Sequence, residues 1–190
     1  GLEEVYVHGF LDGRDVGPRT AIGYVTETEE KMKEIGIGKF ASISGRYYAM
    51  DRDRRWERVL LAYKAIVDGL GRTAESATAG ILASYEEDIV DEFVVPFVIE
   101  EDAKPAVTID TNDAVIFFNF RPDRAIQLSM ALNTPSFDSI PLSDKHPTNL
   151  KFVTFTHYSD DVVADVVFEK ADLYNTVGEV LAKHGKTQLR

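Results

Sequence analysis

The chain has 190 residues, of which 44% are hydrophobic and 28% charged, proportions typical of a globular protein with one sizeable core. It contains no cysteine, which excludes disulfides, thiolate nucleophiles and cysteine-based metal sites. The formal net charge of -11 argues against nucleic acids and anionic membranes as partners, and no apolar run approaches the ~20 residues of a membrane-spanning helix.

The N-terminal half predicts strands that alternate with helices. Residues 2–9 mix apolar and β-branched positions and predict a strand, and the turn-rich residues 11–18 follow it. From Ile22 to Ile35 the apolar residues recur at helical spacing, and Gly36 is the expected end of that helix. Residues 40–44 alternate and predict a second strand.

The middle of the chain continues this pattern. Residues 56–67 form a clear amphipathic pattern and predict a helix, whereas the small, glycine-rich residues 69–80 predict a loop. Residues 81–88 predict a short helix. Residues 93–99 predict a strand that Pro96 places at a sheet edge or a bulge.

The C-terminal half adds three strands and two helices. The nearly all-apolar residues 114–120 predict a fully buried strand, and Pro122 opens a helix over residues 123–132. Two strands are expected at 151–157 and 162–168, and a final helix at 175–184. The alternation predicts an α/β protein, a three-layer α/β/α sandwich with a mostly parallel or mixed sheet.

Three short segments combine arginine with glycine, proline or aspartate, and each comes directly after a predicted strand. They are residues 12–15, 44–54 and 119–124. In α/β sheets ligands bind at the carboxyl ends of strands, so these segments could direct five arginines at one crevice. The five are Arg14, Arg46, Arg52, Arg121 and Arg124.

The chemistry that fits five arginines is recognition of a small polyanion. Guanidinium groups bind carboxylate and phosphate through two parallel hydrogen bonds, and helix N-termini add partial positive charge. Asp15 differs, because an anion among cations can accept hydrogen bonds from substrate hydroxyls or move a proton. The alternative is that these residues form ordinary surface ion pairs, each worth ~0–1 kcal/mol.

Other chemical signatures are missing from the sequence. It has no GxGxxG, P-loop or GxSxG motif. The four histidines show neither HxH nor HxxxH spacing, so no local metal pair is encoded and we predict no metal ligand in this chain. Structural roles are expected for all four, and His8 is the least certain, because it lies on the strand that leads into the first arginine segment.

The segments VHGFLDGRDVGP, ISGRYYAMDRDRRWERV and FNFRPDRAIQ resemble the signature blocks of the cofactor-independent phosphoglycerate mutases, in the order and at roughly the spacing of that family. NTVGEVLAKHGKTQLR resembles the stretch that leads back to the family's other domain. The resemblance covers essentially the whole chain. It implies an isomerase of glycolysis that interconverts 3-phosphoglycerate and 2-phosphoglycerate through a phosphoserine, a covalent intermediate that divides one difficult transfer into two easier ones.

The resemblance also implies roles for individual residues. Arg14 and Asp15 would contact the glycerate, with Asp15 on the hydroxyls and as the candidate proton shuttle. Arg46 and Arg52 would hold anionic groups of the substrate, and Arg121 and Arg124 would reach its carboxylate or phosphate. Which arginine binds which group stays open.

Arginines that converge without an anion repel one another. We therefore also expect neutralising carboxylates near the guanidinium groups, from Asp15, Asp51, Asp53 or Asp123, or a captured anion.

The resemblance places the serine nucleophile and two manganese ions in family segments that this chain lacks. Residues 1–172 would be the substrate-binding domain, truncated at its N-terminus, and residues 173–190 a linker and the start of the metal-binding domain. We therefore expect a fragment without activity of its own, cut from a cytoplasmic, monomeric parent whose partners are the two phosphoglycerates. The alternatives are a free-standing module that binds small anions without catalysis, and a protein-interaction domain.

Overall fold

In a computed structural model of the chain, residues 1–100, 107–134, 137–169 and 173–189 are described. In these ranges the strands are β1 (Tyr6–Leu11), β2 (Lys39–Gly45), β3 (Arg72–Ala74), β4 (Phe97–Ile99), β5 (Ala114–Phe117), β6 (Lys151–Thr156) and β7 (Asp165–Phe168). The helices are α1 (Ala21–Ile35), α2 (Arg46–Ala49), α3 (Trp56–Val67), α4 (Ala77–Glu86), α5 (Ile126–Asn133) and α6 (Val177–Lys183), with the 3-10 turns η1 (Asp91–Phe93) and η2 (Pro122–Arg124).

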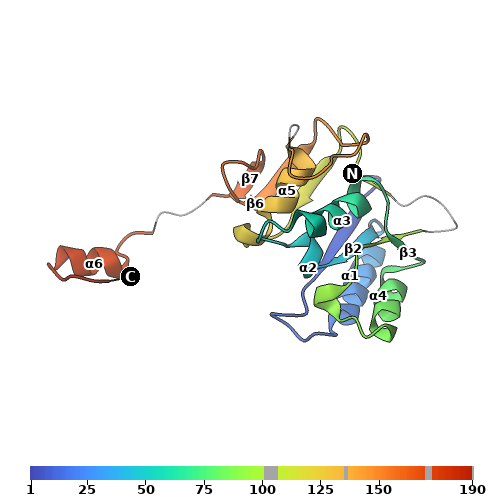
Figure 1. The fold of residues 1–190 in the computed structure, drawn as a ribbon, viewed down its shortest axis with the longest axis horizontal. Coiled ribbons are helices and arrows are strands. Elements are labelled where there is room, and N and C mark those ends of the chain that lie inside the picture. Colours follow the sequence, from blue (N-terminus) through green and yellow to red (C-terminus); the bar gives the residue numbers. More distant parts are fainter. Residues whose placement is uncertain (101–106, 135–136, 170–172, 190) are drawn as a thin grey trace.

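The strands form two sheets (Figure 1). The first has the order β1-β2-β4-β3, in which only the β2–β4 pair is antiparallel. The second has the order β5-β6-β7 and is entirely parallel. The predicted α/β class with mixed and parallel sheets is therefore confirmed, and the strands are divided between two sheets.

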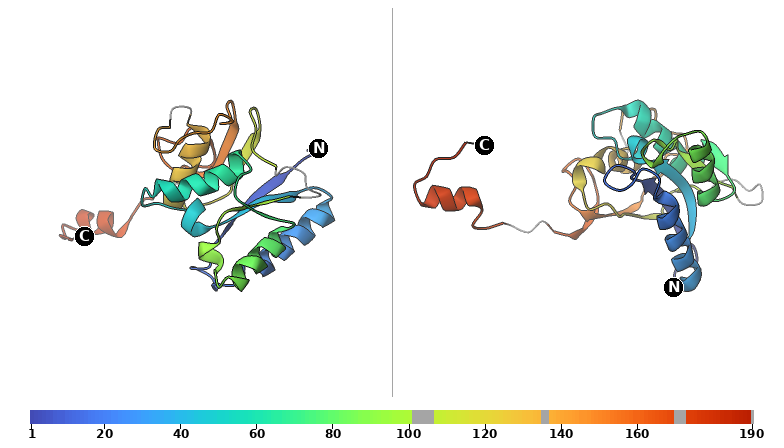
Figure 2. Two further views of the ribbon diagram at one scale, coloured as in Figure 1. Left: turned by 45° about the vertical axis from the view of Figure 1, so that its right-hand side comes forward. Right: turned by 90° about the horizontal axis from the view of Figure 1, so that it is seen from below.

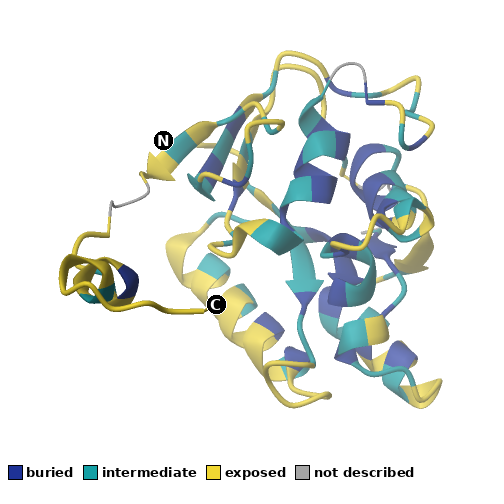
Figure 3. Ribbon diagram, turned by 60° about the vertical axis from the view of Figure 1, so that its left-hand side comes forward, coloured by how far each residue is buried: buried dark blue, intermediate teal, exposed yellow. Residues whose placement is uncertain are grey.

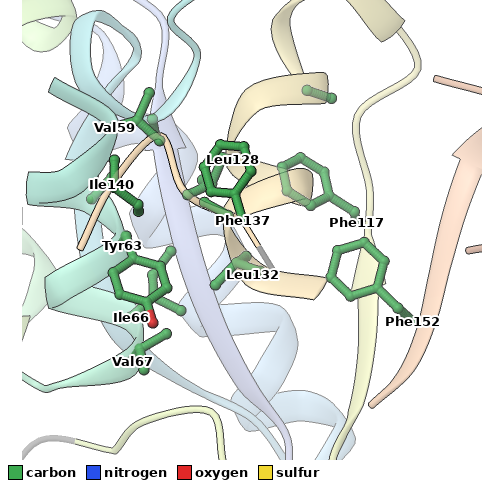
Figure 4. Packing of buried hydrophobic residues seen from close by; sticks show 14 of the residues in the cluster. Val59, Tyr63, Ile66, Val67, Phe117, Leu128, Leu132, Phe137, Ile140 and Phe152 are labelled. Carbon is green, nitrogen blue, oxygen red and sulfur yellow. The ribbon is translucent and has the colours of Figure 1, made fainter. Parts of the chain in front are cut away.

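Two apolar cores hold the helices against the strands. In the first sheet, α1 and α4 lie side by side on one face, where Val25 and Ile81 pack against Ile43 and Phe97 (Figure 2). The larger core joins α3 and α5 to the second sheet, with Leu128 of α5 between α3 and the strands (Figure 4). Burial of apolar surface in these two cores stabilises the layered arrangement.

Several elements agree with the sequence pattern. Helix α3 has the predicted bounds, 56–67, and α1 ends at Gly36, whose φ of 83° is the left-handed conformation that favours glycine. The helix predicted at 175–184 is α6, which begins at a capping box formed by Thr176 and Glu179. Most of α6 and its flanking residues are exposed (Figure 3), and the helix stands apart from the sheets.

The loop predicted at residues 69–80 is wrong, because β3 and the first turn of α4 lie within it. The small residues there allow the helix and the strand to pack closely. A Cβ atom added to Gly80 would lie 2.3 Å from the Phe97 ring, so glycine lets α4 approach β4. The edge position predicted for residues 93–99 is also wrong, since β4 lies between β2 and β3 and begins only after Pro96.

The strand predicted at 114–120 is shorter and less buried than expected. β5 ends at Phe117 and lies at the edge of its sheet, and Ile116 and Phe118 are exposed. The proposed boundary between residues 172 and 173 falls beside residues 170–172, which lie outside the described residues. No helix in the described ranges is both long and apolar enough to span a membrane.

Candidate functional site

The three arginine segments meet because of how the strands that precede them are arranged. β1 and β2 are parallel neighbours whose last residues, Leu11 and Gly45, are paired, so the loops that follow them start side by side. The ring of Phe10 in β1 lies 5.8 Å, centroid to centroid, from that of Phe117 in β5. The third segment follows β5 and is therefore delivered to the same end of the strands.

Arg46 is the buried centre of one half of this site. It is the first residue of α2, and its side chain is only 4% exposed. Its guanidinium group contacts Asp12 and donates from Nη1 to Oδ2 of Asp15 at 2.9 Å. Burial alone would lower the pKa of Arg46, but the hydrogen bonds to the two carboxylates raise it, so the charged form is held firmly.

Asp12 organises the first loop around Arg46. Its Oδ1 accepts the backbone N–H groups of Arg14 at 3.2 Å and Asp15 at 3.1 Å, the pattern of an Asx turn. Burial would raise the pKa of Asp12, but these N–H groups and the Arg46 guanidinium lower it. The carboxylate is thus ionised and links the loop backbone to the buried cation.

Asp123 is the centre of the other half. Its carboxylate accepts hydrogen bonds from Arg121, at 2.6 and 3.0 Å, and from Arg52, at 2.6 Å. The two hydrogen bonds from Arg121 lower the pKa of Asp123, burial acts in the opposite direction, and the hydrogen bond from Arg52 lowers it further. The resulting pKa is about 2. One carboxylate therefore joins the second and third arginine segments.

Arg124 connects the two halves. Its Nη1 donates at 3.0 Å to the carbonyl of Met50, a residue that lies between Arg46 and Arg52 in the chain. Burial and then the positive charges of Arg46, Arg52 and Arg121 lower the pKa of Arg124, so all four guanidinium groups are within electrostatic range. We call these four arginines, with Asp12, Asp15 and Asp123, the arginine cluster.

The cluster carries four cations and three anions, and part of its hydrogen-bonding capacity is unused. The Nε atoms of Arg46 and Arg124 are buried and have no hydrogen-bond partner among the described residues. Buried donors without partners are uncommon in folded proteins, so they mark a place where an acceptor would be favourable.

Arg14 is on the first loop, but its side chain turns to another partner. It is 63% exposed, and Nη1 donates to Oε1 of Glu92 in η1 at 3.2 Å. Of the six residues predicted for the site, the structure thus brings Asp15, Arg46, Arg52, Arg121 and Arg124 together and pairs Arg14 with Glu92 beside them.

Sequence reasoning missed two of the carboxylates, Asp12 and Glu92. Asp12 carried a usable signal, because aspartate two residues before Arg14 is typical of an Asx turn. Glu92 carried none, since it is 78 residues away from Arg14 in the chain. Asp51, expected near the guanidinium groups, is buried and accepts the N–H groups of Asp53 and Arg55, so it shapes the second loop.

The structure gives His8 a structural environment. Its Nδ1 is 2.7 Å from Ser42 Oγ, across the β1–β2 pair, and burial lowers the pKa of the imidazole to about 4. In the described ranges no group of three or more histidine, aspartate or glutamate side chains is placed to hold a metal ion.

A hollow of about 610 Å³ lies at the opposite end of β1 and β2. Its lining includes Glu3, Glu4, Glu29 and Glu75, with Lys33 and Lys39. Burial raises the pKa of Glu29, because the charged carboxylate loses water there and gains little stabilisation from nearby groups. Acidic side chains outnumber basic ones in this lining by four to two, which disfavours an anion, so the arginine cluster is the better anion site.

Comparison with known proteins identifies the family. The sequence family described as "BPG-independent PGAM N-terminus" matches residues 1–160. The 2,3-bisphosphoglycerate-independent phosphoglycerate mutases of Staphylococcus saprophyticus and Listeria welshimeri are 53% and 50% identical over 190 residues, all of this chain and 37% of each relative.

The fold agrees with that match. A crystal structure of Leishmania mexicana phosphoglycerate mutase, at low cobalt concentration, superposes with a TM-score of 0.79 and 28% identity, over 96% of this chain and 35% of that one. The chain spans little more than a third of the length of these relatives. From its sequence, its fold and the extent of the match, the chain belongs to the family of BPG-independent phosphoglycerate mutases, in the part described as their N-terminus.

Proposed function

We propose that the chain is the substrate-binding part of a phosphoglycerate mutase and that the arginine cluster binds the anionic groups of 3-phosphoglycerate and 2-phosphoglycerate. One observation carries the proposal: three loops far apart in sequence bring four guanidinium groups together, two of them with an unpartnered buried Nε atom. A phosphoglycerate carries a carboxylate and a phosphate, both of which match the guanidinium fork.

In this proposal Arg46 and Arg52 hold anionic groups of the substrate, and Arg121 and Arg124 reach its carboxylate or phosphate. Arg14 leaves Glu92 to contact the glycerate. Asp15, whose side chain is 67% exposed, accepts hydrogen bonds from the substrate hydroxyls and moves a proton. Bound substrate would supply the acceptors that the cluster lacks, and until it arrives Asp123 and Asp12 would offset the mutual repulsion of the guanidinium groups.

The chemical step is assigned to residues outside this chain. The described residues do not fit a dinuclear manganese centre, because they offer no cluster of metal ligands. We therefore derive no step through a metal, and we propose residues 1–172 as the binding domain and residues 173–190 as the connection to a catalytic domain. The longer protein is expected to act as a monomer in the cytoplasm.

The test compares two arginines of similar environment in the longer protein that contains this chain. Arg52 and Arg72 each form one ion pair, at 2.6 Å with Asp123 and 2.7 Å with Glu87, and are comparably exposed. Arg52→Ala should lower kcat/KM for 3-phosphoglycerate at least about a hundredfold, whereas Arg72→Ala should stay within about twofold of the wild type. Equal effects of the two substitutions would reject the proposed site.

The main alternative is an anion-binding module that works without any other domain. It predicts that the 190-residue chain alone binds a phosphoglycerate tightly. Calorimetry on the isolated chain distinguishes the two proposals. A free-standing module with a complete site should bind with micromolar affinity, whereas half a site should give a Kd of about 1 mM or weaker.

A further inference from the structure

The turn η1 contacts the arginine loops although it lies far from them in sequence and belongs to none of them. It connects α4 to β4 and begins with Asp91, which is 1% exposed. A carboxylate buried to this degree is stable only where hydrogen bonds replace the water it has lost. The partners of Asp91 therefore indicate what it holds in place.

Asp91 fixes the end of the first arginine loop. Its Oδ2 accepts the backbone N–H groups of Thr20 and Ala21, each at 2.9 Å, where the loop becomes α1. Its own N–H donates to the Pro18 carbonyl at 2.9 Å. Three hydrogen bonds from one residue thus attach residues 18–21 to η1, and Tyr85 donates its hydroxyl to the other carboxylate oxygen.

The next residue of η1 holds an arginine of the same loop. Glu92 is only 17% exposed, whereas its partner Arg14 is 63% exposed. The carboxylate is therefore the fixed member of the pair and the guanidinium the movable one. Glu92 accepts a single hydrogen bond from Arg14, donated by Nη1, and the Glu92 side chain reaches the first loop from η1.

The opposite side of η1 lies against the second arginine loop. The Gly45 N–H donates to the Val94 carbonyl at 2.8 Å, directly before Arg46. A Cβ atom on Gly45 would lie 2.4 Å from the Glu92 carbonyl oxygen, so only glycine allows this approach. The ring of Phe93 contacts that of Tyr47 at 5.2 Å, centroid to centroid. Both loops are thus held against one turn.

We infer that Asp91 is a positioning residue of the substrate grip: through η1 it fixes the loop that carries Arg14 and Asp15 relative to the turn that carries Arg46. The inference rests on the proposed function of the arginine cluster. Its physical basis is that a displacement of about 1 Å at a binding group costs up to about a hundredfold in rate.

The test uses the longer protein with three substitutions. Asp91→Ala removes the acceptor for both backbone N–H groups, and Asp91→Asn keeps one oxygen that can accept them. Tyr85→Phe is the matched control, because it removes a hydrogen bond to the same buried carboxylate, leaves Oδ2 to accept both backbone N–H groups, and keeps the ring whose centroid lies 5.3 Å from the guanidinium carbon of Arg19. The readouts are kcat/KM for 3-phosphoglycerate, amide hydrogen exchange of residues 12–21, and the melting temperature.

We expect Asp91→Ala to lower kcat/KM at least about tenfold and to accelerate exchange in residues 12–21 by a similar factor, with Asp91→Asn between it and the wild type. Tyr85→Phe should lower the melting temperature but keep kcat/KM within about twofold. If Asp91→Ala does not fold, Asp91→Asn must still lower kcat/KM by about threefold or more.

Two results would overturn the inference: an Asp91→Ala protein that folds with nearly normal kcat/KM, or a Tyr85→Phe protein that loses as much activity as the Asp91 variants at equal loss of stability. A wild-type protein without mutase activity would refute the proposed function instead. The exchange measurement needs no substrate, so it would then still refute or support the anchoring of the loop by Asp91.

Discussion

The pairing of Arg46 with Asp12 predicts an asymmetry between two substitutions. The Arg46 side chain is 4% exposed, whereas Asp12 is 36% exposed and Asp15 67%. Asp12→Ala leaves a buried cation with a single carboxylate partner. Arg46→Met removes the buried charge, fills much of the same volume, and leaves two carboxylates that water can reach.

The structure gives the size of each effect. Breaking a buried ion pair by removing one partner costs ~3–5 kcal/mol, whereas replacing the buried charge by an apolar side chain is often neutral. Asp15 still neutralises Arg46 in Asp12→Ala, which reduces the cost, but the N–H groups of Arg14 and Asp15 lose their acceptor. We therefore expect Asp12→Ala to cost about 2–3 kcal/mol and Arg46→Met about 0–1.5 kcal/mol.

Urea unfolding of the three chains measures these differences by linear extrapolation. Glu34→Ala is the control, because Glu34 forms an exposed ion pair with Lys31 in α1 and its loss should cost less than ~1 kcal/mol. The reasoning is refuted if Arg46→Met destabilises the chain as much as Asp12→Ala, since the guanidinium would then be the stabilising member of the group.

Three further outcomes are expected. The purified 190-residue chain should show no transfer between 3-phosphoglycerate and 2-phosphoglycerate with any divalent metal in an enolase-coupled assay, and turnover above background would contradict its assignment as a binding domain. Stability should fall as the pH is lowered from 6.5 to about 4, because the unfolded chain protonates His8 and the folded chain does not. Denaturant titrations of the His8→Gln variant should not show this decline in stability, and a decline equal to that of the wild type would exclude His8 as its source. The ion pairs of Asp123 should stabilise the fold fully above its unfolded pKa of 3.8, and this stabilisation should be lost as the pH falls through about 2. Asp123→Asn should therefore destabilise the chain at pH 6 and progressively less below pH 4. A difference in stability from the wild type that does not change with pH would show that the charge is irrelevant.

Elements with a strong local pattern could be predicted from the sequence. Helix α3 follows from its apolar spacing, and the end of α1 follows from Gly36. Gly80 shows where this reasoning fails, because a small residue has the same local appearance in a loop and at a helix–strand contact. The exposure of Ile116 in β5 depends on its neighbours in the sheet, which the apolar run itself does not reveal.

The arginines of the candidate site could also be predicted, because each follows a strand and the carboxyl ends of parallel strands lie together. Their partners could be predicted only in part. Asp15 and Asp123 were expected and are present, but Glu92 reaches Arg14 only through the packing of η1 against the first loop. Long-range contacts of this kind depend on the whole fold and have no local signal.

The central claim is that the arginines of three loops bind one phosphoglycerate together, and arginine side-chain NMR tests it directly. We predict that titration of the chain with 3-phosphoglycerate shifts the Nε–Hε signals of Arg46, Arg52, Arg121 and Arg124 along one common curve, with a Kd of about 1 mM or weaker that rises with salt. The signals of Arg19 and Arg72, which pair with Asp88 and Glu87, should stay unchanged. Shifts confined to Arg19 and Arg72, separate curves for the cluster arginines, or no shift at any of them would contradict the claim.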